Sequence, residues 1–204
     1  MSALPTQVQP SLRERRREKR RLEILAAALE VFSEQGYSQA SMDGIAERAL
    51  LTRVGLYKHF RDKATLVVAL REWKLAELAE RVQSVVETAP NLETKIRAIV
   101  FETIQFQNDH KNFFRILVAT SFSADIPTDE SLKPYLHALQ NVLEAGIQSG
   151  ELKAGRSPEY AGMLATLAFE PSIKRNFVSV AEDFVAPPAL AELIVNLFLH
   201  GLKS

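Results

Sequence analysis

The chain has 204 residues, of which 47% are hydrophobic and 25% charged, a composition typical of a folded globular protein and unlike that of a fibrous or disordered one. It contains no cysteine, which excludes disulfides, thiolate zinc sites, iron–sulfur clusters and cysteine nucleophiles. The formal net charge is zero, but residues 1–63 hold 12 Lys and Arg against 8 Asp and Glu, which leaves 13 against 17 for the remainder. We therefore expect a polyanionic partner, if there is one, at the basic N-terminal third.

The sequence also limits the compartment and the cofactors that we expect. The N-terminus lacks an apolar signal core, and no apolar run approaches the roughly 18 residues of a membrane span. A metal would need His or carboxylate ligands, but neither HExxH nor an inward Glu-x-x-His pair occurs. We expect a cytoplasmic protein with no membrane partner, no metal and no cofactor, and we expect it not to be an enzyme.

Helical periodicity runs through the chain and predicts an all-α fold. A first helix is predicted to end at Gly36, and its apolar face consists of Leu22, Leu25, Leu29 and Phe32. Ser41 is the predicted N-cap of a second helix over 42–49, with Ile45 and Ala49 facing inward. Thr52 is the predicted N-cap of a third helix to His59, and Asp62 that of a fourth from Lys63 to Glu87.

The second and third helices are joined by about three residues, which is the arrangement of a helix-turn-helix motif. Beyond the break at 88–91, further helices are predicted over 92–108, 111–123, 131–149, 157–180 and 187–202. Pro171 lies inside the penultimate one and is expected to kink or split it.

The third helix has one apolar and one basic face. Leu56 and Phe60 are four residues apart and form the expected inward anchors, while Val54 and Lys58 lie opposite with Gly55 beside them. Tyr57 and His59 flank this outer face, and Arg53 lies at its start. Arg and Lys can donate to guanine acceptors in the major groove, and hydroxyls can bind phosphate oxygens. The alternative is that the charged face is merely solvated.

Residues 21–67 resemble the DNA-binding domain of the TetR family of bacterial transcription regulators. The pieces that carry the resemblance are "ILAAALEVFSEQGY", "SMDGIAERA", "LYKHF" and "DKATLV", in this order. The resemblance implies a basic tail over 1–20, a helix-turn-helix domain over 21–67 and a helical effector-binding and dimerisation domain over 68–204, joined by the fourth helix. It implies DNA contacts by Ser41, Thr52, Arg53, Val54, Gly55, Tyr57, Lys58, His59 and Lys63.

Two positions depart from the family pattern. Members usually have glycine where this chain has Leu50, and a leucine there costs about 1 to 2 kcal/mol if the turn keeps a positive φ. Members also carry a hydroxyl residue where this chain has Gly55, so one phosphate contact is missing unless the backbone approaches DNA closely. The tail segment "SLRERRREKRR" (11–21) either extends the first helix and contacts DNA or is a disordered solubilising tail.

The C-terminal part holds a candidate effector pocket and a candidate dimer face. A partly apolar small-molecule effector would contact Trp73, Phe101, Thr103, Gln107, Phe113, Phe122, Tyr135, His137, Asn141 and Met163. The homodimer implied by the resemblance would use Met163, Leu164, Leu167, Leu190, Leu193, Ile194, Leu197 and Phe198. The resemblance thus implies a repressor that binds a near-palindromic operator on double-stranded DNA and is released by its effector. Control by a protein partner, or activation of transcription, stays open as an alternative.

Overall fold

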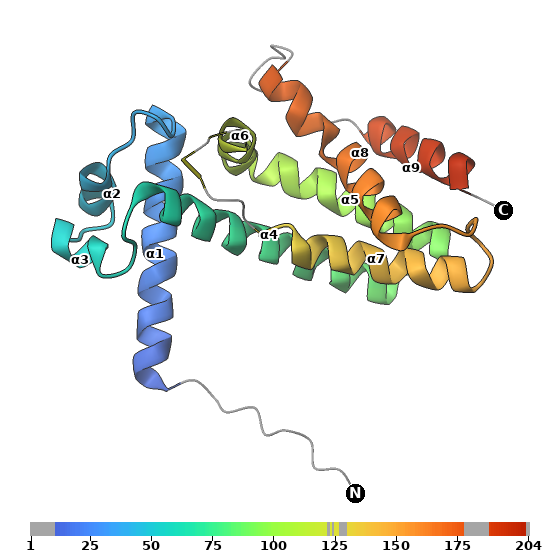
Figure 1. Cartoon of the computed structure of the whole chain (residues 1–204), viewed down its shortest axis with the longest axis horizontal. Helices are drawn as coiled ribbons and strands as arrows, with labels where there is room; N and C mark the ends of the chain where they lie inside the picture. The colour runs from blue at the N-terminus through green and yellow to red at the C-terminus, as the bar shows by residue number, and fades with distance from the viewer. Residues whose placement is uncertain (1–10, 122, 124, 127–129, 178–187, 203–204) are drawn as a thin grey trace, which may run out of the picture. The chain divides into compact units, whose positions relative to one another are not determined.

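The computed structural model describes residues 11–121, 123, 125–126, 130–177 and 188–202, and the side chains of 171–177 are outside this description. Within these residues the chain forms helices and no strand, so the predicted all-α fold is confirmed. The chain divides into two compact units, Met1–Leu66 and Val67–Ser204. Figure 1 labels the helices in chain order.

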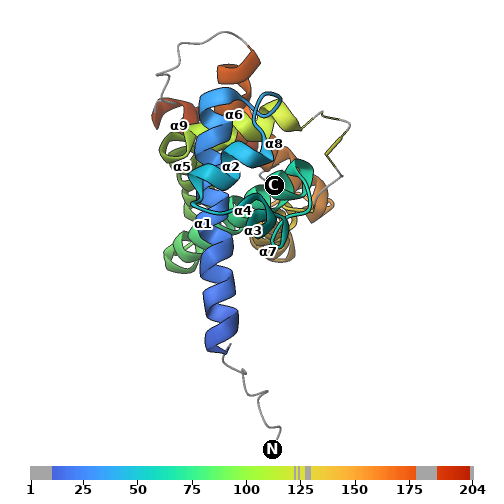
Figure 2. The same cartoon turned by 90° about the vertical axis from the view of Figure 1, so that its left-hand side faces the viewer.

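The first unit contains α1 (Leu12–Gln35), α2 (Met42–Arg48), α3 (Arg53–Tyr57) and the first residues of α4 (Lys63–Thr88). The buried side chains of α1 are Ile24, Leu25, Ala27, Ala28, Val31 and Phe32. The guanidinium of Arg48 fixes α2 to α1 through ion pairs of 2.9 Å with Glu30 and 2.7 Å with Glu34. Helix α2 thus lies against the C-terminal part of α1, and α3 packs against α2 (Figure 2).

The first helix begins earlier than the predicted domain boundary. Ser11 is its N-cap and forms a capping box with Glu14, in which each side chain accepts a hydrogen bond from the other residue's backbone N–H. Residues 12–20, which we expected to belong to a tail, are therefore the first turns of α1. Residues 1–10 of that tail lie outside the described residues.

In its described residues, the second unit contains the rest of α4 and five further helices. These are α5 (Leu92–Asp109), α6 (Lys111–Thr120), α7 (Lys133–Gln148), α8 (Ser157–Phe177) and α9 (Pro188–Leu202). The predicted helices are all found, but α8 runs through position 171 as one helix, so Pro171 does not split it. Residues 122, 178–180 and 187 of the predicted helices lie outside the described residues.

The core of the second unit is built where α5 and α8 meet each other and their neighbours, with α7 and α6 against α8 and α9 against α5. Phe106, Phe113, Phe114 and Tyr135 are its largest fully buried side chains. Gly146 of α7 allows a close approach to α5, because a Cβ there would lie 2.6 Å from Cδ2 of Leu92. A larger residue at 146 would therefore require the buried side chains of Leu92 and Leu152 to shift.

Candidate functional site

The predicted N-caps of α2 and α3 are confirmed. The Ser41 hydroxyl oxygen accepts a hydrogen bond from the Gly44 N–H at 3.1 Å, and that of Thr52 accepts from the Gly55 N–H at 3.1 Å. A hydroxyl oxygen that accepts a cap bond still carries its own proton. Both groups are exposed, so each keeps one donor for an external acceptor.

The predicted anchors of α3 are confirmed as well. Leu56 is fully buried and Phe60 is 3% exposed, whereas Val54 is 68% and Tyr57 39% exposed. Lys58 is also exposed. The inner side of α3 is therefore fixed by two apolar contacts, and its outer side presents an aliphatic, a phenolic and a cationic group.

Arg53 extends this outer side. Its guanidinium forms an exposed ion pair of 3.0 Å with Asp43 of α2 and lies 5.6 Å from the centre of the Tyr57 ring. Exposed ion pairs contribute about 0–1 kcal/mol. Asp43 therefore orients Arg53 without preventing it from binding a stronger acceptor.

Gly55 does not lie on the outer face where the helical wheel placed it. A Cβ built on Gly55 would lie 3.2 Å from the hydroxyl oxygen of Thr52 and 3.4 Å from Cδ2 of Leu51. The position thus points into the turn that precedes α3. Where family members carry a hydroxyl side chain, this chain therefore has a glycine that packs tightly against the N-cap residue Thr52 and against Leu51. The sequence did not reveal this packing.

Lys63 has a different set of partners from the predicted DNA backbone. Its ammonium group donates to the carbonyl oxygens of Tyr37 at 2.6 Å, Ser38 at 3.1 Å and Ala40 at 2.9 Å. It also lies 4.5 Å from the centre of the Tyr37 ring. All three of its protons are used, so in this structure Lys63 holds the loop between α1 and α2.

His59 turns toward α1 and is half-buried. Burial, together with the charges of Arg17 and Arg20, holds the pKa of His59 below its usual range. The imidazole is therefore neutral at pH 7 and can bind a phosphate only as a neutral donor.

Leu50 keeps the left-handed conformation that its position requires. Its φ is 53°, and it is the one non-glycine residue with positive φ in the described part of the chain. Its side chain is 88% exposed. The turn has therefore not been remodelled, and the leucine is held in a strained conformation without packing that offsets the strain.

Four of the predicted pocket residues belong to the core of the second unit. The Tyr135 hydroxyl lies 3.0 Å from the Thr103 hydroxyl, and the Gln107 side-chain amide donates to the carbonyl of Ala168 at 2.7 Å. Burial raises the pKa of Tyr135 well above its usual range. Phe113 is 1% exposed. All four side chains are buried, and the polar ones have hydrogen-bond partners within the second unit.

An open groove of about 830 Å³ lies between α4, the start of α5 and α7. Two predicted residues, His137 and Asn141, line it. Much of its wall consists of small or aliphatic side chains: Ala76, Ala79, Val86, Leu92, Ala138, Val142, Ala145 and Gly146. The only sequence signal for this groove was the spacing of the alanines along α4 and α7. That spacing does not show that the two helices face each other.

The remaining predicted pocket residues lie elsewhere. Trp73 and Phe101 are half-buried outside the groove lining, and Met163 is 51% exposed on α8. Phe122 lies outside the described residues. The groove wall also carries Lys95 and the acidic residues Glu80, Glu87 and Glu151, so its rim has both signs of charge.

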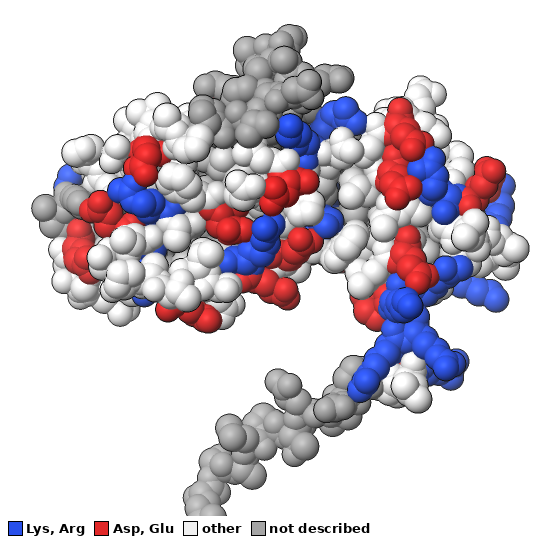
Figure 3. Space-filling view, turned by 180° about the vertical axis from the view of Figure 1, so that it is seen from behind, with Lys and Arg blue, Asp and Glu red and all other residues white. Residues whose placement is uncertain are grey.

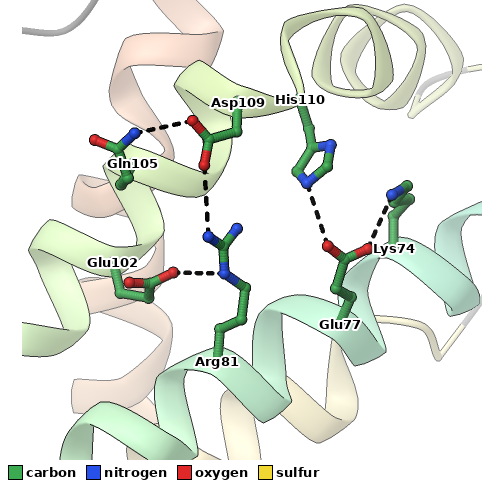
Figure 4. A network of polar contacts seen from close by, with 7 residues as sticks. All are labelled: Lys74, Glu77, Arg81, Glu102, Gln105, Asp109 and His110. Carbon is green, nitrogen blue, oxygen red and sulfur yellow. Dashed lines mark hydrogen bonds and ion pairs between the residues drawn. The ribbon is translucent and has the colours of Figure 1, made fainter.

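A polar cluster joins α4 to α5 and to the corner between α5 and α6 (Figure 4). Arg81 pairs with Glu102 at 2.8 Å and Asp109 at 3.5 Å, and Glu77 contacts both Lys74 at 2.9 Å and His110 at 3.3 Å. Burial, followed by the nearby Lys74 charge, lowers the pKa of His110. This cluster was not predicted, because its partners are about 20 to 35 residues apart.

The predicted dimer residues fall into three sets. Leu164, Ile194 and Phe198 are buried within the second unit. Met163, Leu193 and Leu197 are 51%, 53% and 59% exposed. Leu167 and Leu190 are intermediate. Helices α8 and α9 thus each carry large apolar side chains that the chain itself leaves uncovered.

Two negative findings apply to the residues that the structure describes. In those ranges, no helix combines the length and the apolar character that a membrane span requires. The same residues contain no group of three or more His, Asp or Glu side chains placed to hold a metal ion.

Known proteins share this architecture. Residues 24–70 match the family model for bacterial regulatory proteins of the tetR family. The chain is 26% identical over 188 residues to the fatty acid metabolism regulator protein of Bacillus subtilis, a match that covers 90% of this chain and 95% of the relative. It is 31% identical over 106 residues to the transcriptional activator FasR of Mycolicibacterium smegmatis, which covers 52% of this chain and 48% of the relative.

Solved structures agree on the fold. The transcriptional regulator FadR from Bacillus subtilis, solved in complex with stearoyl-CoA, has a TM-score of 0.75 at 23% identity. That match covers 88% of this chain and 98% of the FadR chain. A FadR from Bacillus halodurans has a TM-score of 0.70 at 20% identity, covering 88% and 94% of the two chains.

Proposed function

Because the chain belongs to the TetR family of bacterial regulatory proteins, we propose that it is a ligand-responsive repressor that binds a near-palindromic DNA operator as a homodimer. The observation that carries the proposal is the outer side of α3. Leu56 anchors this short helix from within, while Val54, Tyr57 and Lys58 are exposed next to the free hydroxyl proton of Thr52. Such a surface combines donors for phosphates with groups that can contact base edges.

Each exposed group has a role in this proposal. Lys58 and Arg53 donate to guanine O6 and N7 in the major groove, and Val54 contacts a thymine methyl group. Tyr57 and the hydroxyls of Ser41 and Thr52 bind phosphate oxygens and fix the register. On DNA binding, Arg53 leaves its exposed ion pair with the Asp43 carboxylate and donates to the base edge instead.

The homodimer explains the apolar side chains left exposed on α8 and α9. Met163, Leu193 and Leu197 pack against the same helices of a second copy, which removes them from water. A symmetric dimer presents two α3 helices about 34–36 Å apart, one turn of DNA, so the operator has two matching half-sites.

The proposed effector is a fatty acyl thioester of coenzyme A. Its support is the groove between α4 and α7, whose volume is in the range of small-molecule sites and whose wall is largely aliphatic. The relative from Bacillus subtilis is named a fatty acid metabolism regulator, and a FadR of similar fold was solved in complex with stearoyl-CoA. The acyl chain lies along the alanine-rich wall, and Lys95 and His137 face the polar end. A ligand that binds one conformation of α4 better shifts the DNA-competent population.

The DNA part of the proposal is tested by selecting duplexes from a random library on the purified full chain. A near-palindromic consensus is expected, and Tyr57→Ala and Lys58→Ala should each weaken binding at least tenfold while remaining folded. Lys133→Ala removes the same charge from α7 and is the matched control. If both α3 variants bind as tightly as the parent, α3 is not the reading helix.

The effector part is tested with stearoyl-CoA against coenzyme A alone, both added to the protein–DNA complex. Stearoyl-CoA should release the DNA, and Ala145→Trp, which fills the groove, should abolish this release without altering DNA affinity. Gln148→Trp places the same bulk at an exposed position of α7 outside the groove lining. Unchanged response in Ala145→Trp contradicts this site. Tighter DNA binding on addition of stearoyl-CoA contradicts release by the effector and instead identifies a ligand that favours the DNA-bound state.

A further inference from the structure

The buried face of α1 continues toward the N-terminus of the helix, past α2 and α3. Ile24, Ala27 and Val31 are buried along that face. Going back toward the N-terminus, the same alternating steps of four and three residues lead to Arg20, Arg17 and Arg13. We call these three residues the arginine stripe. The helical spacing and the contact of Arg20 with Leu50 place it on the side of α1 that carries the helix-turn-helix. Figure 1 shows that α1 extends beyond α2 and α3 at this end.

The arginine stripe begins beside the turn that leads into α3. The Arg20 guanidinium donates to the carbonyl of Leu50 at 3.4 Å, and Arg17 and Arg20 both act electrostatically on His59 at the other end of α3. Arg20 also pairs with Glu23 at 2.7 Å. Within the described residues Arg13 and Arg17 are exposed and have no ion-pair partner. Figure 3 shows the basic side chains gathered on this part of α1.

The stripe is carried by an ordered helix, which fixes its direction. The capping box of Ser11 and Glu14 satisfies the first backbone donors, and the hydrogen bond from the Ser11 backbone lowers the pKa of Glu14. From Arg20 to Arg13 the helix advances by about 10 Å, at 1.5 Å per residue. Two unpaired cations are thus held at a set distance from α3.

We propose that Arg13 and Arg17 bind DNA phosphates that flank the base pairs contacted by α3. This inference rests on the proposed function, because α3 must lie on DNA for the stripe to reach the adjacent backbone. Charge complementarity identifies the partner: the stripe offers guanidinium groups in a row, and the duplex backbone offers phosphates in a row. The contact extends the footprint of each protomer without adding sequence information.

The test compares two double variants of the full chain that remove equal charge from opposite sides of α1. Arg13→Gln with Arg17→Gln removes the two unpaired arginines of the stripe, and Arg15→Gln with Lys19→Gln changes residues at the same spacing on the other side. Anisotropy titrations between 50 and 200 mM KCl give the salt dependence for a selected operator duplex with flanks of eight base pairs and for one trimmed to its half-sites. Circular dichroism confirms that both variants are folded.

Each phosphate that the protein no longer neutralises should reduce the slope of log K against log salt by about 0.9, so the four arginines of a dimer account for about 3.6. We expect this reduction for the stripe variant on the long duplex only, and the parent should fall to the same slope on the trimmed duplex. An unchanged slope for the stripe variant, or an equal reduction for the control variant, overturns the inference. If the parent itself prefers no duplex, the proposed function fails instead.

Discussion

Replacing Leu50 with glycine should stabilise the first unit. The residue has φ of 53°, a conformation that costs an L-residue about 1–2 kcal/mol relative to glycine. Its side chain is 88% exposed, so little packing is lost with it. Glycine gives the unfolded chain more freedom, which opposes the gain by about 0.4–1 kcal/mol. The difference predicts that Leu50→Gly raises the free energy of unfolding by about 1 kcal/mol.

Two further variants separate the effect of the backbone from that of the side chain. Leu50→Ala removes the same side chain but keeps a Cβ in the left-handed conformation, so its stability should stay within about 0.5 kcal/mol of the parent. Leu50→Asn should fall between alanine and glycine, because asparagine tolerates this region better than other L-residues.

Urea unfolding followed by circular dichroism measures the series, provided that the slopes against urea are equal. The expected order of stability is Gly, Asn, then Ala and Leu together. A glycine variant no more stable than the alanine variant would refute the presence of strain at this turn.

Three other changes test the packing and the polar contacts. Lys63→Met should lower the free energy of unfolding by about 1–3 kcal/mol, since it strips the ammonium donor from carbonyls of loop 37–40; an unchanged urea midpoint would contradict this. Gly146→Ala should destabilise the second unit by about 1–3 kcal/mol through the contact with Leu92, seen as a lower melting temperature. His110 has a lowered pKa in the folded state, so its contribution to stability is present above about pH 6.5 and is lost as pH falls through the folded pKa. His110→Gln should flatten that part of the stability profile, and an unaltered profile would exclude His110 as its source.

The helices that we propose to read DNA were predictable because their signals are local. The caps Ser41 and Thr52 and the anchors Leu56 and Phe60 follow from spacing within a single turn or helix, and the structure places them as expected. The structure adds the capping box at Ser11, which marks the start of α1.

The residues that differed from prediction depend on partners far away in sequence. Lys63 bonds to carbonyls 23 to 26 residues earlier, and His59 lies against α1. A helical wheel shows the face of one helix and not what lies opposite. Gly55 illustrates this limit, since the wheel placed it outward and the structure turns its Cβ direction toward Leu51 and Thr52.

The candidate effector site was the least predictable feature. Its groove exists because α4 and α7 lie side by side, about 60 residues apart in sequence. The sequence favoured large aromatic and polar residues, and several of these are buried in the core, where Tyr135 bonds to the Thr103 hydroxyl and Gln107 donates to the Ala168 carbonyl. The alanines that line the groove carry no chemical signal of their own.

Hydrogen–deuterium exchange of the full chain, with and without a selected operator duplex, shows directly whether α3 binds DNA, because it locates the duplex on the protein. We predict slower exchange on DNA binding over residues 41–58, which hold α2, the turn and α3, and no protection of the groove lining on α7. Protection confined to the second unit, or no protection of α3 while the duplex is bound, would contradict DNA binding by α3.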